Sequence, residues 1–408
     1  MKELLSKVSK ELKPNEKVSS EIDAVIKNIN ALLKKAGVKA ECVRGGSTAK
    51  GTFLKNDYDV DLFVRFDKKT RGNISDILEK SLKKEFKLER VHGSRDYFQI
   101  HNKLLFEIVP VRKISNYKEA KNVTDMSPLH VDYVKKKLQK NQADEIRLAK
   151  QFCKAAKVYG AESYIKGFSG HILDLLVIHY RSFEKLVRAA VDWKPKVVID
   201  IEKHLKDPLK ELDEAKIYAP LIIVDPIQPD RNAAAALSKE KFDRFVDSCK
   251  KFLLNPNKEF FKVKYIQKEK VAGKVLPNEE LFFFEITALK GKNDVIGAKI
   301  MKAYEYMKTS LKKYEFEIVK TDWEFKEKGI IYFILKKEKL SEKMIVRGPP
   351  INRKDGVQRF KAVHKKVFEK NKRLFAEEKR KYRVTSELIK VLLKDKYVKE
   401  RVKKISKK

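Results

Sequence analysis

The sequence predicts an α+β protein in which two sheet-containing regions flank a helical one. Segments that alternate between apolar and polar residues occur toward both ends of the chain and predict strands, whereas apolar residues spaced three and four apart dominate the middle and predict helices. The chain has 408 residues, of which 42% are hydrophobic, so it can bury several cores. We expect domains at residues 1–140, 141–255 and 256–408.

The first region mixes helices and strands. Residues 1–37 predict a helix that ends at Gly37, and "AECVRGG" at 40–46 predicts a strand that leads into a helix from Thr48 onward. The later elements are a strand in "DYDVDLFVRF" at 57–66, a helix in "ISDILEKSLKKEF" at 74–86 and a hairpin in "YFQIHNKLLFEIVPV" at 97–111.

Helices dominate from residue 141 onward. Four cations recur along one side of the segment 143–160 and predict a basic helix face, namely Arg147, Lys150, Lys154 and Lys157. Further helices are expected at 169–180, 182–193 and 238–253. Before the last of these, "APLIIVDPIQPDRNAAAAL" at 219–237 predicts an apolar strand and a proline-rich turn.

The C-terminal region begins with a predicted strand at 279–289, a helix at 293–314 and a hairpin at 316–337. This order predicts a small sheet covered by a helix, as in a ferredoxin-like or RRM-like domain. The run of Phe282, Phe283 and Phe284 is expected in the sheet core rather than stacked on bases. Residues 368–408 predict a helical tail rich in lysine.

The charge of the chain points to a polyanionic partner. There are 94 Lys and Arg against 57 Asp and Glu, a formal net charge of +37. The ion-paired surface of a heat-adapted protein would explain many charges of both signs, but not this excess of one sign. Nucleic acid is therefore the expected partner.

Secreted, zinc-finger and membrane classes are disfavoured. The three cysteines, Cys42, Cys153 and Cys249, lie far apart and lack the spacing of a zinc site. The first 17 residues lack the apolar core of a signal peptide. The most apolar run, "GHILDLLVIHY" at 170–180, is interrupted by charged and polar residues and is shorter than the roughly 20 residues of a membrane helix. We expect a cytoplasmic protein without a membrane partner.

A small island of acid stands out in this basic chain. Asp59 and Asp61 lie two apart on a predicted strand, so their side chains project from the same face about 6 to 7 Å apart. Gly45, Gly46 and Ser47 precede them and lead into a helix, where backbone amides favour an anion. The pattern suits a nucleoside triphosphate held through Mg²⁺.

A third acid is expected close to the first two. Glu107 in "LLFEIVPV" is the best choice, because it too lies on an alternating apolar strand where a charge needs a reason. A charge that protects an edge strand from aggregation is the alternative for such an acid.

These motifs carry a resemblance. "GGSTAKGTFLKNDYDVDLFV" at 45–64 resembles the nucleotidyltransferase superfamily of DNA polymerase beta and the poly(A) polymerases. "DMSPLHVDYVKKKL", "AKVYGAESYIKGFSGHILDLLVIHYRSF", "VDPIQPDRNAAAALS" and "VRGPP" narrow the resemblance to archaeal-type, class I CCA-adding tRNA nucleotidyltransferases. The resemblance covers about the first 250 residues well and the remainder loosely.

The resemblance implies a polymerase-beta-like catalytic domain and a set of site residues. Its three metal-binding, catalytic carboxylates match Asp59, Asp61 and Glu107, which would hold two Mg²⁺ ions. Its nucleotide contacts match Gly46, Ser47, Lys50, His130, Lys150, Tyr159 and Arg231, of which the last is the residue that recognises the incoming base. Glu107 stands where Asp is more common, and Lys50 stands where Arg is common.

The implied reaction adds C, C and A stepwise to the 3′ end of tRNA, and repairs incomplete ends. CTP and ATP are the nucleotide substrates, pyrophosphate leaves, and the acceptor stem of tRNA is the nucleic-acid partner. Taken singly, His130, Lys150, Tyr159 and Arg231 also suit structural roles, as a helix start, a solvated face, a core residue and a turn charge.

Other functions remain open at this point. The alternatives are a poly(A) or oligoadenylate polymerase of the same superfamily and a non-catalytic RNA-binding protein. The sequence also leaves both a monomer and a homodimer open.

Overall fold

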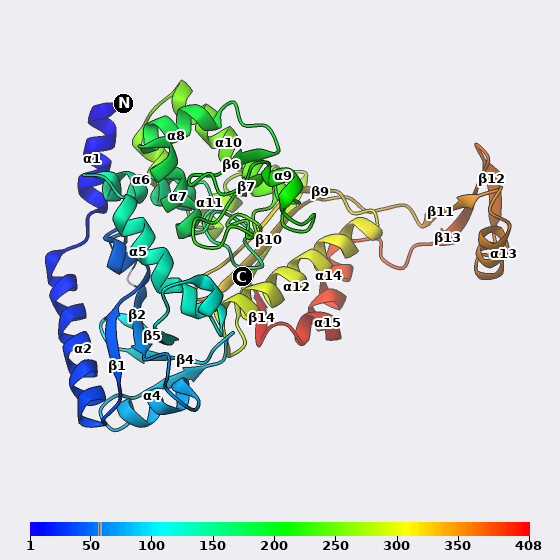
Figure 1. Cartoon of the computed structure of the whole chain (residues 1–408). Helices are drawn as coiled ribbons and strands as arrows, with labels where there is room; N and C mark the ends of the chain where they lie inside the picture. Colours follow the sequence, from blue (N-terminus) through cyan, green and yellow to red (C-terminus); the bar gives the residue numbers. More distant parts are fainter. Residues whose placement is uncertain (56, 58) are drawn as a thin grey trace. The chain divides into compact units, whose positions relative to one another are not determined.

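The computed structural model describes residues 1–55, 57 and 59–408, and these divide into two compact units, Met1–Lys264 and Tyr265–Lys408. Figure 1 follows the chain from the N-terminal helices in blue to the C-terminal strand in red. The α+β class predicted from the sequence is confirmed. Position 58 of the predicted strand at 57–66 lies outside the described residues.

A five-stranded sheet organises the first part of unit 1, with strand order β1-β2-β5-β4-β3. The β2–β5 pair is parallel and the other neighbours are antiparallel. The predicted hairpin is β4 and β5. The strands are β1 Ala40–Arg44, β2 Asp59–Phe66, β3 Glu89–Val91, β4 Tyr97–His101 and β5 Leu105–Arg112.

Helices cover both faces of this sheet. On one face, α2 and α4 pack on alternate residues of β2 and β5, including Val60, Leu62 and Phe106. On the other, Phe63 and Val111 pack with Val131 of α5, and α3 lies close to β2 and α5. The helices are α2 Glu16–Lys35, α3 Gly46–Lys50, α4 Ile74–Leu82 and α5 Ser127–Lys137.

The single helix predicted for residues 1–37 is wrong. The chain forms α1 (Lys2–Leu12) and then α2, with Pro14 in the break between them. Proline lacks the amide hydrogen that a continuous helix needs and clashes with the preceding turn. Gly37 follows the end of α2 with a φ of +66°, as expected for a glycine just beyond a helix.

The rest of unit 1 is mostly helical and has its own core. Phe152, Phe183, Phe252 and Phe261 are buried there, with ring centroids 5.4 to 6.0 Å apart in each of the pairs that include Phe152. A short parallel pair, β6 Val197–Ile199 and β7 Leu221–Ile223, lies beside them. The helices are α6 Gln142–Ala155, α7 Gly170–Tyr180, α8 Phe183–Ala190, α9 Pro208–Glu211 and α10 Lys239–Leu254.

Unit 2 contains a four-stranded antiparallel sheet with the order β14-β8-β10-β9. Phe282, Phe283 and Phe284 of β8 are all buried, so the core assignment is confirmed. The central elements are β8 Glu279–Thr287, α12 Asn293–Lys313, β9 Ile318–Phe325 and β10 Gly329–Lys336; short α11 Lys268–Ala272 precedes them.

The helical tail predicted for residues 368–408 is only partly correct. Residues 367–379 form two strands of a second, three-stranded sheet, and the last strand pairs with β8. Within residues 368–408, only α14 and α15 are helical. The elements are β11 Lys343–Pro350, α13 Lys354–Val363, β12 Val367–Lys370, β13 Arg373–Lys379, α14 Thr385–Lys394, α15 Lys396–Lys399 and β14 Lys404–Lys407.

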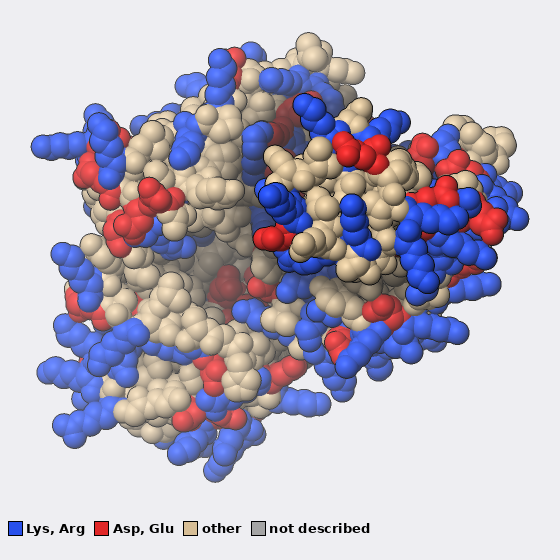
Figure 2. Space-filling view, turned by 90° about the vertical axis from the view of Figure 1, so that its right-hand side faces the viewer, with Lys and Arg blue, Asp and Glu red and all other residues tan. Residues whose placement is uncertain are grey.

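Lys and Arg side chains are spread widely over the face of the molecule drawn in Figure 2. Among the described residues, no helix has both the length and the apolar character needed to cross a membrane.

Candidate functional site

Asp59, Asp61 and Glu107 lie on one face of the five-stranded sheet. Parallel pairing of β2 with β5 places Asp61 directly opposite Glu107. Val60 and Leu62, which alternate with the two aspartates, are fully buried against the opposite face. The structure therefore places the three predicted carboxylates on the face that α3 and α5 cover.

The glycine turn before β2 brings the main chain against Asp61. The Gly45 amide donates a hydrogen bond of 2.8 Å to the backbone oxygen of Asp61. Gly46 has a φ of +47°, and a Cβ at this position would fall 1.8 Å from Asp61 Oδ2. Glycine is therefore required here both for its backbone conformation and for the space next to the carboxylate. Ser47 follows in α3, and its backbone oxygen accepts from the Thr52 amide at 3.0 Å.

Asp61 is half-buried and Asp59 is exposed, yet negative charge is unfavourable at both positions. Burial raises the pKa of Asp61 to about 7, and the negative charge of Glu107 adds to this effect. Burial also raises the pKa of Asp59, with Asp57 as the second cause. Gln99 Nε2 donates to Glu107 Oε1 at 2.7 Å and orients that carboxylate. Crowded, partly desolvated oxygen donors of this kind fit a divalent cation such as Mg²⁺.

Lys50, Lys150 and Asp174 form a buried charge cluster. Lys50 Nζ donates to Asp174 Oδ2, and Lys150 Nζ lies 3.8 Å from Asp174 Oδ1. Lys150 Nζ also donates to the backbone oxygen and the hydroxyl of Thr52, at 3.1 and 3.0 Å. Burial lowers the pKa of Lys150 to about 8. Two cations share a single anion, so the cluster keeps an excess of positive charge.

The basic side of α6 packs against the segment between α3 and β2. Arg147 is 8% exposed and donates to the backbone oxygen of Gly51, and Lys154 pairs with Asp57. Lys150 is only 3% exposed. The solvated-face alternative for Lys150 is therefore excluded, because this side of the helix is largely an internal surface.

Tyr159 lies beside the lysine cluster. A Cβ on Gly170 would be 3.2 Å from the Tyr159 hydroxyl and 3.7 Å from Lys150 Nζ, so a glycine at the start of α7 leaves room for both. Lys154 Nζ lies 5.0 Å from the centroid of the Tyr159 ring. Burial raises the pKa of Tyr159, and its hydroxyl therefore stays protonated and able to donate.

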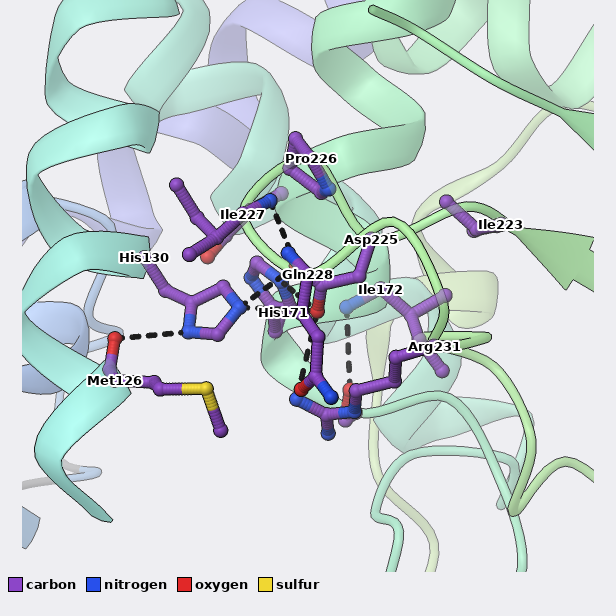
Figure 3. A network of polar contacts seen from close by, with 12 residues as sticks. Met126, His130, His171, Ile172, Ile223, Asp225, Pro226, Ile227, Gln228 and Arg231 are labelled. Carbon is purple, nitrogen blue, oxygen red and sulfur yellow. Dashed lines mark hydrogen bonds and ion pairs between the residues drawn. The ribbon is translucent and has the colours of Figure 1, made fainter. Parts of the chain in front are cut away.

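His130 and Arg231 meet at Asp225, in the turn after β7 (Figure 3). His130 Nε2 lies 2.9 Å from both carboxylate oxygens of Asp225, and Arg231 Nη1 is 3.4 Å from Oδ2. Burial would raise the pKa of Asp225, but the hydrogen bond with His130 and its charge outweigh burial and lower this pKa to about 2. One buried carboxylate thus positions two of the predicted nucleotide contacts.

The predicted site residues therefore form three neighbouring groups in unit 1. The acids lie with Gly46 on the sheet, Lys50, Lys150 and Tyr159 surround Asp174, and His130 and Arg231 share Asp225. The charges of Lys50 and Lys150 both act on Asp61, which shows that the first two groups are close.

Three residues of this region were not predicted as site residues, namely Asp174, Asp225 and His171. Asp174 and Asp225 are both fully buried. The available signal was a charged residue inside or next to an apolar run, in "ILDLLVI" and "LIIVDP". Such a residue is rarely buried without a partner. Their partners, however, lie 124 and 95 residues away along the chain.

Three families of known proteins match successive parts of the chain. Residues 25–155 match the nucleotidyltransferase domain, residues 144–262 match the second domain of tRNA nucleotidyltransferase, and residues 285–406 match the C-terminal domain of the CCA-adding enzyme.

Individual relatives agree with these families. The CCA-adding enzyme of Nanoarchaeum equitans is 35% identical over 86% of this chain and 86% of its own length. That of Methanocaldococcus jannaschii is 31% identical over 94% of this chain and 88% of its own length. The structure of a cytoplasmic RNA terminal U-transferase superposes with a TM-score of 0.52 at 17% identity, covering 65% of this chain and 98% of that one, which shows a shared fold alone.

We expect Asp174→Asn to destabilise the protein strongly. The substitution leaves Lys50 and Lys150 without a buried counter-charge, and breaking a buried ion pair in this way costs about 3–5 kcal/mol. Urea denaturation followed by circular dichroism measures the change. Asp243→Asn is the matched control, because Asp243 pairs with Lys239 on an exposed helix surface. The control should change stability by less than about 0.5 kcal/mol. Equal effects of the two substitutions would contradict the role given to Asp174.

Proposed function

The chain belongs to the family of CCA-adding enzymes, and on that premise we propose that it adds C, C and A stepwise to the 3′ end of tRNA. CTP and ATP would be the substrates and pyrophosphate the leaving product, and incomplete ends would be repaired in the same way. The observation that carries the proposal is the succession of three matched families along the chain, together with 35% identity to a CCA-adding enzyme over most of both lengths.

We propose that Asp59, Asp61 and Glu107 hold two Mg²⁺ ions. Proteins of this superfamily generally use divalent metal ions, and the half-buried acids opposite each other on β2 and β5 supply the oxygen donors that such ions prefer. When bound, Mg²⁺ would activate the attacking 3′ hydroxyl and offset the negative charge that develops on the triphosphate. The protein contributes by placing these acids opposite each other on neighbouring strands and by keeping the glycine turn close to Asp61.

The lysine cluster is proposed to receive the triphosphate. Lys50 and Lys150 carry one more positive charge than Asp174 compensates, and the Tyr159 hydroxyl beside them can donate a hydrogen bond. The departing pyrophosphate needs stabilisation of this kind, since phosphoryl transfer is catalysed mainly by positioning and electrostatics. Gly46 and Ser47 in the turn before β2 would approach the same phosphates through their backbone.

We propose that His130 and Arg231 contact the nucleotide, Arg231 at its base. The imidazole of His130 and the guanidinium of Arg231 both contact Asp225, so one carboxylate positions the two side chains. Side chains that are already held in place lower the cost of orienting a bound nucleotide.

The positive charge of the chain has a role in this function. Double-helical RNA is recognised mainly through its backbone, its 2′-hydroxyls and its shape, and Lys and Arg side chains suit that surface. We propose that residues 1–140 form the catalytic domain, 141–255 the nucleotide-binding domain and 256–408 the domain that binds the acceptor arm of tRNA. We place the reaction in the cytoplasm, and a homodimer stays a prediction.

A poly(A) or oligoadenylate polymerase is not favoured. Its catalytic domain would have the same fold, but residues 285–406 match the C-terminal domain of the CCA-adding enzyme.

The decisive experiment is incubation of the protein with Mg²⁺, CTP, ATP and a tRNA that lacks its three terminal nucleotides, followed by sequencing of the products. We expect C-C-A to be added and extension to stop. The same tRNA with a complete end is the control and should not be extended. An open-ended A tail would support a poly(A) polymerase instead, and no incorporation would support a non-catalytic RNA-binding protein.

We expect Asp61→Asn to abolish nucleotide addition without weakening tRNA binding. The substitution removes one of the charges proposed to hold Mg²⁺, so kcat should fall by at least about a hundredfold, as for other electrostatic groups of active sites. Asp67→Asn is a suitable control, because Asp67 is exposed just beyond the end of β2. Single-turnover incorporation of CTP and filter binding of tRNA measure the two effects. Undiminished activity of the Asp61 variant would refute the carboxylate assignment.

We expect Gly46→Ala to inactivate the protein and Gly51→Ala to leave it active. Both glycines have positive φ, +47° and +67°, so alanine should cost each about 1–2 kcal/mol of backbone strain. Only at Gly46 does the added methyl collide with Asp61, whereas nothing lies within 4 Å of the position at Gly51. Displacing a catalytic group by about 1 Å can lower the rate about a hundredfold. Similar CTP incorporation by both variants would show that the close approach of Gly46 to Asp61 is unimportant.

A further inference from the structure

A second group of metal-ligating side chains lies apart from the carboxylates of the sheet. It consists of His130 of α5, His171 of α7 and Asp225 after β7, and one ligand atom of each lies within 4.8 Å of the others. Among the described residues, this is the group of three His, Cys, Asp or Glu side chains whose ligand atoms come this close together. Figure 3 shows the three side chains pointing toward one another.

The hydrogen bonds of His130 require a cation between its ring and Asp225. Its Nδ1 lies 3.1 Å from the backbone oxygen of Met126, which can only accept, so Nδ1 carries a hydrogen. In the neutral ring Nε2 then bears a lone pair, yet it lies 2.9 Å from both oxygens of the Asp225 carboxylate. A proton or a metal ion must therefore occupy the space between them.

The groups that surround the cluster are those that commonly orient metal ligands. A histidine that binds a metal usually donates its other ring N–H to a carbonyl or carboxylate, which is the part that Met126 plays for His130. Ligating carboxylates are in turn held by hydrogen bonds. The amides of Ile227 and Gln228 donate to Asp225 Oδ1 at 2.9 and 3.1 Å.

His171 decides between a proton and a metal ion. Its Nε2 is buried and has no hydrogen-bond partner among the described residues, although it lies 4.0 Å from Asp225 Oδ2. A proton shared by His130 and Asp225 would satisfy those two residues and leave His171 Nε2 unpaired. A metal ion would be coordinated by all three side chains.

We propose that His130, His171 and Asp225 bind a transition-metal ion of the Zn²⁺ class. Two imidazoles and one carboxylate suit Zn²⁺ or Co²⁺, whereas Mg²⁺ prefers oxygen ligands alone. With metal–ligand bonds of about 2.0–2.2 Å, ligand atoms around a tetrahedral ion lie roughly 3.3–3.5 Å apart. The separations of 2.9 and 4.0 Å from the imidazoles to Asp225 are within about 0.6 Å of this geometry, whereas the widest separation in the group, 4.8 Å, must contract by about 1.3 Å. Three protein ligands leave a fourth position open.

Arg231 is the competing cation. Its Nη1 is 3.4 Å from Asp225 Oδ2, which is longer than the 2.9 Å between His130 Nε2 and each oxygen of the same carboxylate. The side chain is 44% exposed and can turn toward solvent. Removing its charge should therefore strengthen binding of the ion.

The inference does not rest on the proposed function, because ion binding is measured without nucleotide or RNA. The experiment titrates the full chain, free of any histidine tag and in excess Mg²⁺, with Co²⁺ and follows visible d–d absorption. We expect one equivalent of Co²⁺ to bind with imidazole-type absorption and to be displaced by Zn²⁺. The absence of saturable absorption, which means that the cluster holds a proton only, would overturn the proposal.

Variants locate the ion. His171→Gln should lower the Co²⁺ affinity by at least about tenfold, since even groups that merely orient metal ligands are worth about 10–100-fold. His179→Gln, an exposed residue of the same helix, should leave the affinity unchanged. Arg231→Gln should raise the affinity about threefold or more, an opposite effect that misfolding would not produce. Equal affinities in the wild type, His171→Gln and Arg231→Gln proteins would refute the assignment.

Discussion

The close approach of a glycine backbone to a half-buried carboxylate is the constraint on which the site depends. Asp61 Oδ2 occupies the space where any side chain at position 46 would begin, and Glu107 lies opposite it on the next strand. The parallel register of β2 and β5 therefore concentrates negative charge beneath a turn that is free of side chains. Such a place is unfavourable for the protein alone and favourable once cations and a phosphate chain fill it.

Positive charge is organised in the same way on the facing helices. Asp174 is buried between Lys50 of α3 and Lys150 of α6, so that helices from distant parts of the chain are joined by one anion. The arrangement keeps both lysines charged and directed while one positive charge stays uncompensated. A negative centre on the sheet beside a positive centre on the helices suits a triphosphate bound together with metal ions. Asp225 plays the same part for His130 and Arg231, because both side chains contact its carboxylate.

Much of the fold followed from local patterns. The alternation in "DYDVDLFVRF" and "LLFEIVPV" predicted both the strands and the shared face of the acids, because side chains on a strand alternate between faces. The errors have physical causes. Pro14 interrupts the helix predicted for residues 1–37, and the apolar periodicity of that segment did not indicate the break. The C-terminal residues Lys404–Lys407 look helical by composition, but they complete a sheet by pairing with β8, more than 100 residues earlier in the chain.

The sequence by itself determined the types of residue and their local spacing: the acids on β2 and β5, the glycine turn before them and the excess of positive charge. The motifs in the sequence also resemble a known family, and that resemblance implied most of the candidate site residues. Only the tertiary structure decided which charges face one another. Asp174, Asp225 and His171 acquire their roles from partners on other helices, and short-range periodicity holds no information about such pairs. Burial then makes each pairing obligatory, because an unpaired charge in the interior costs several kcal/mol.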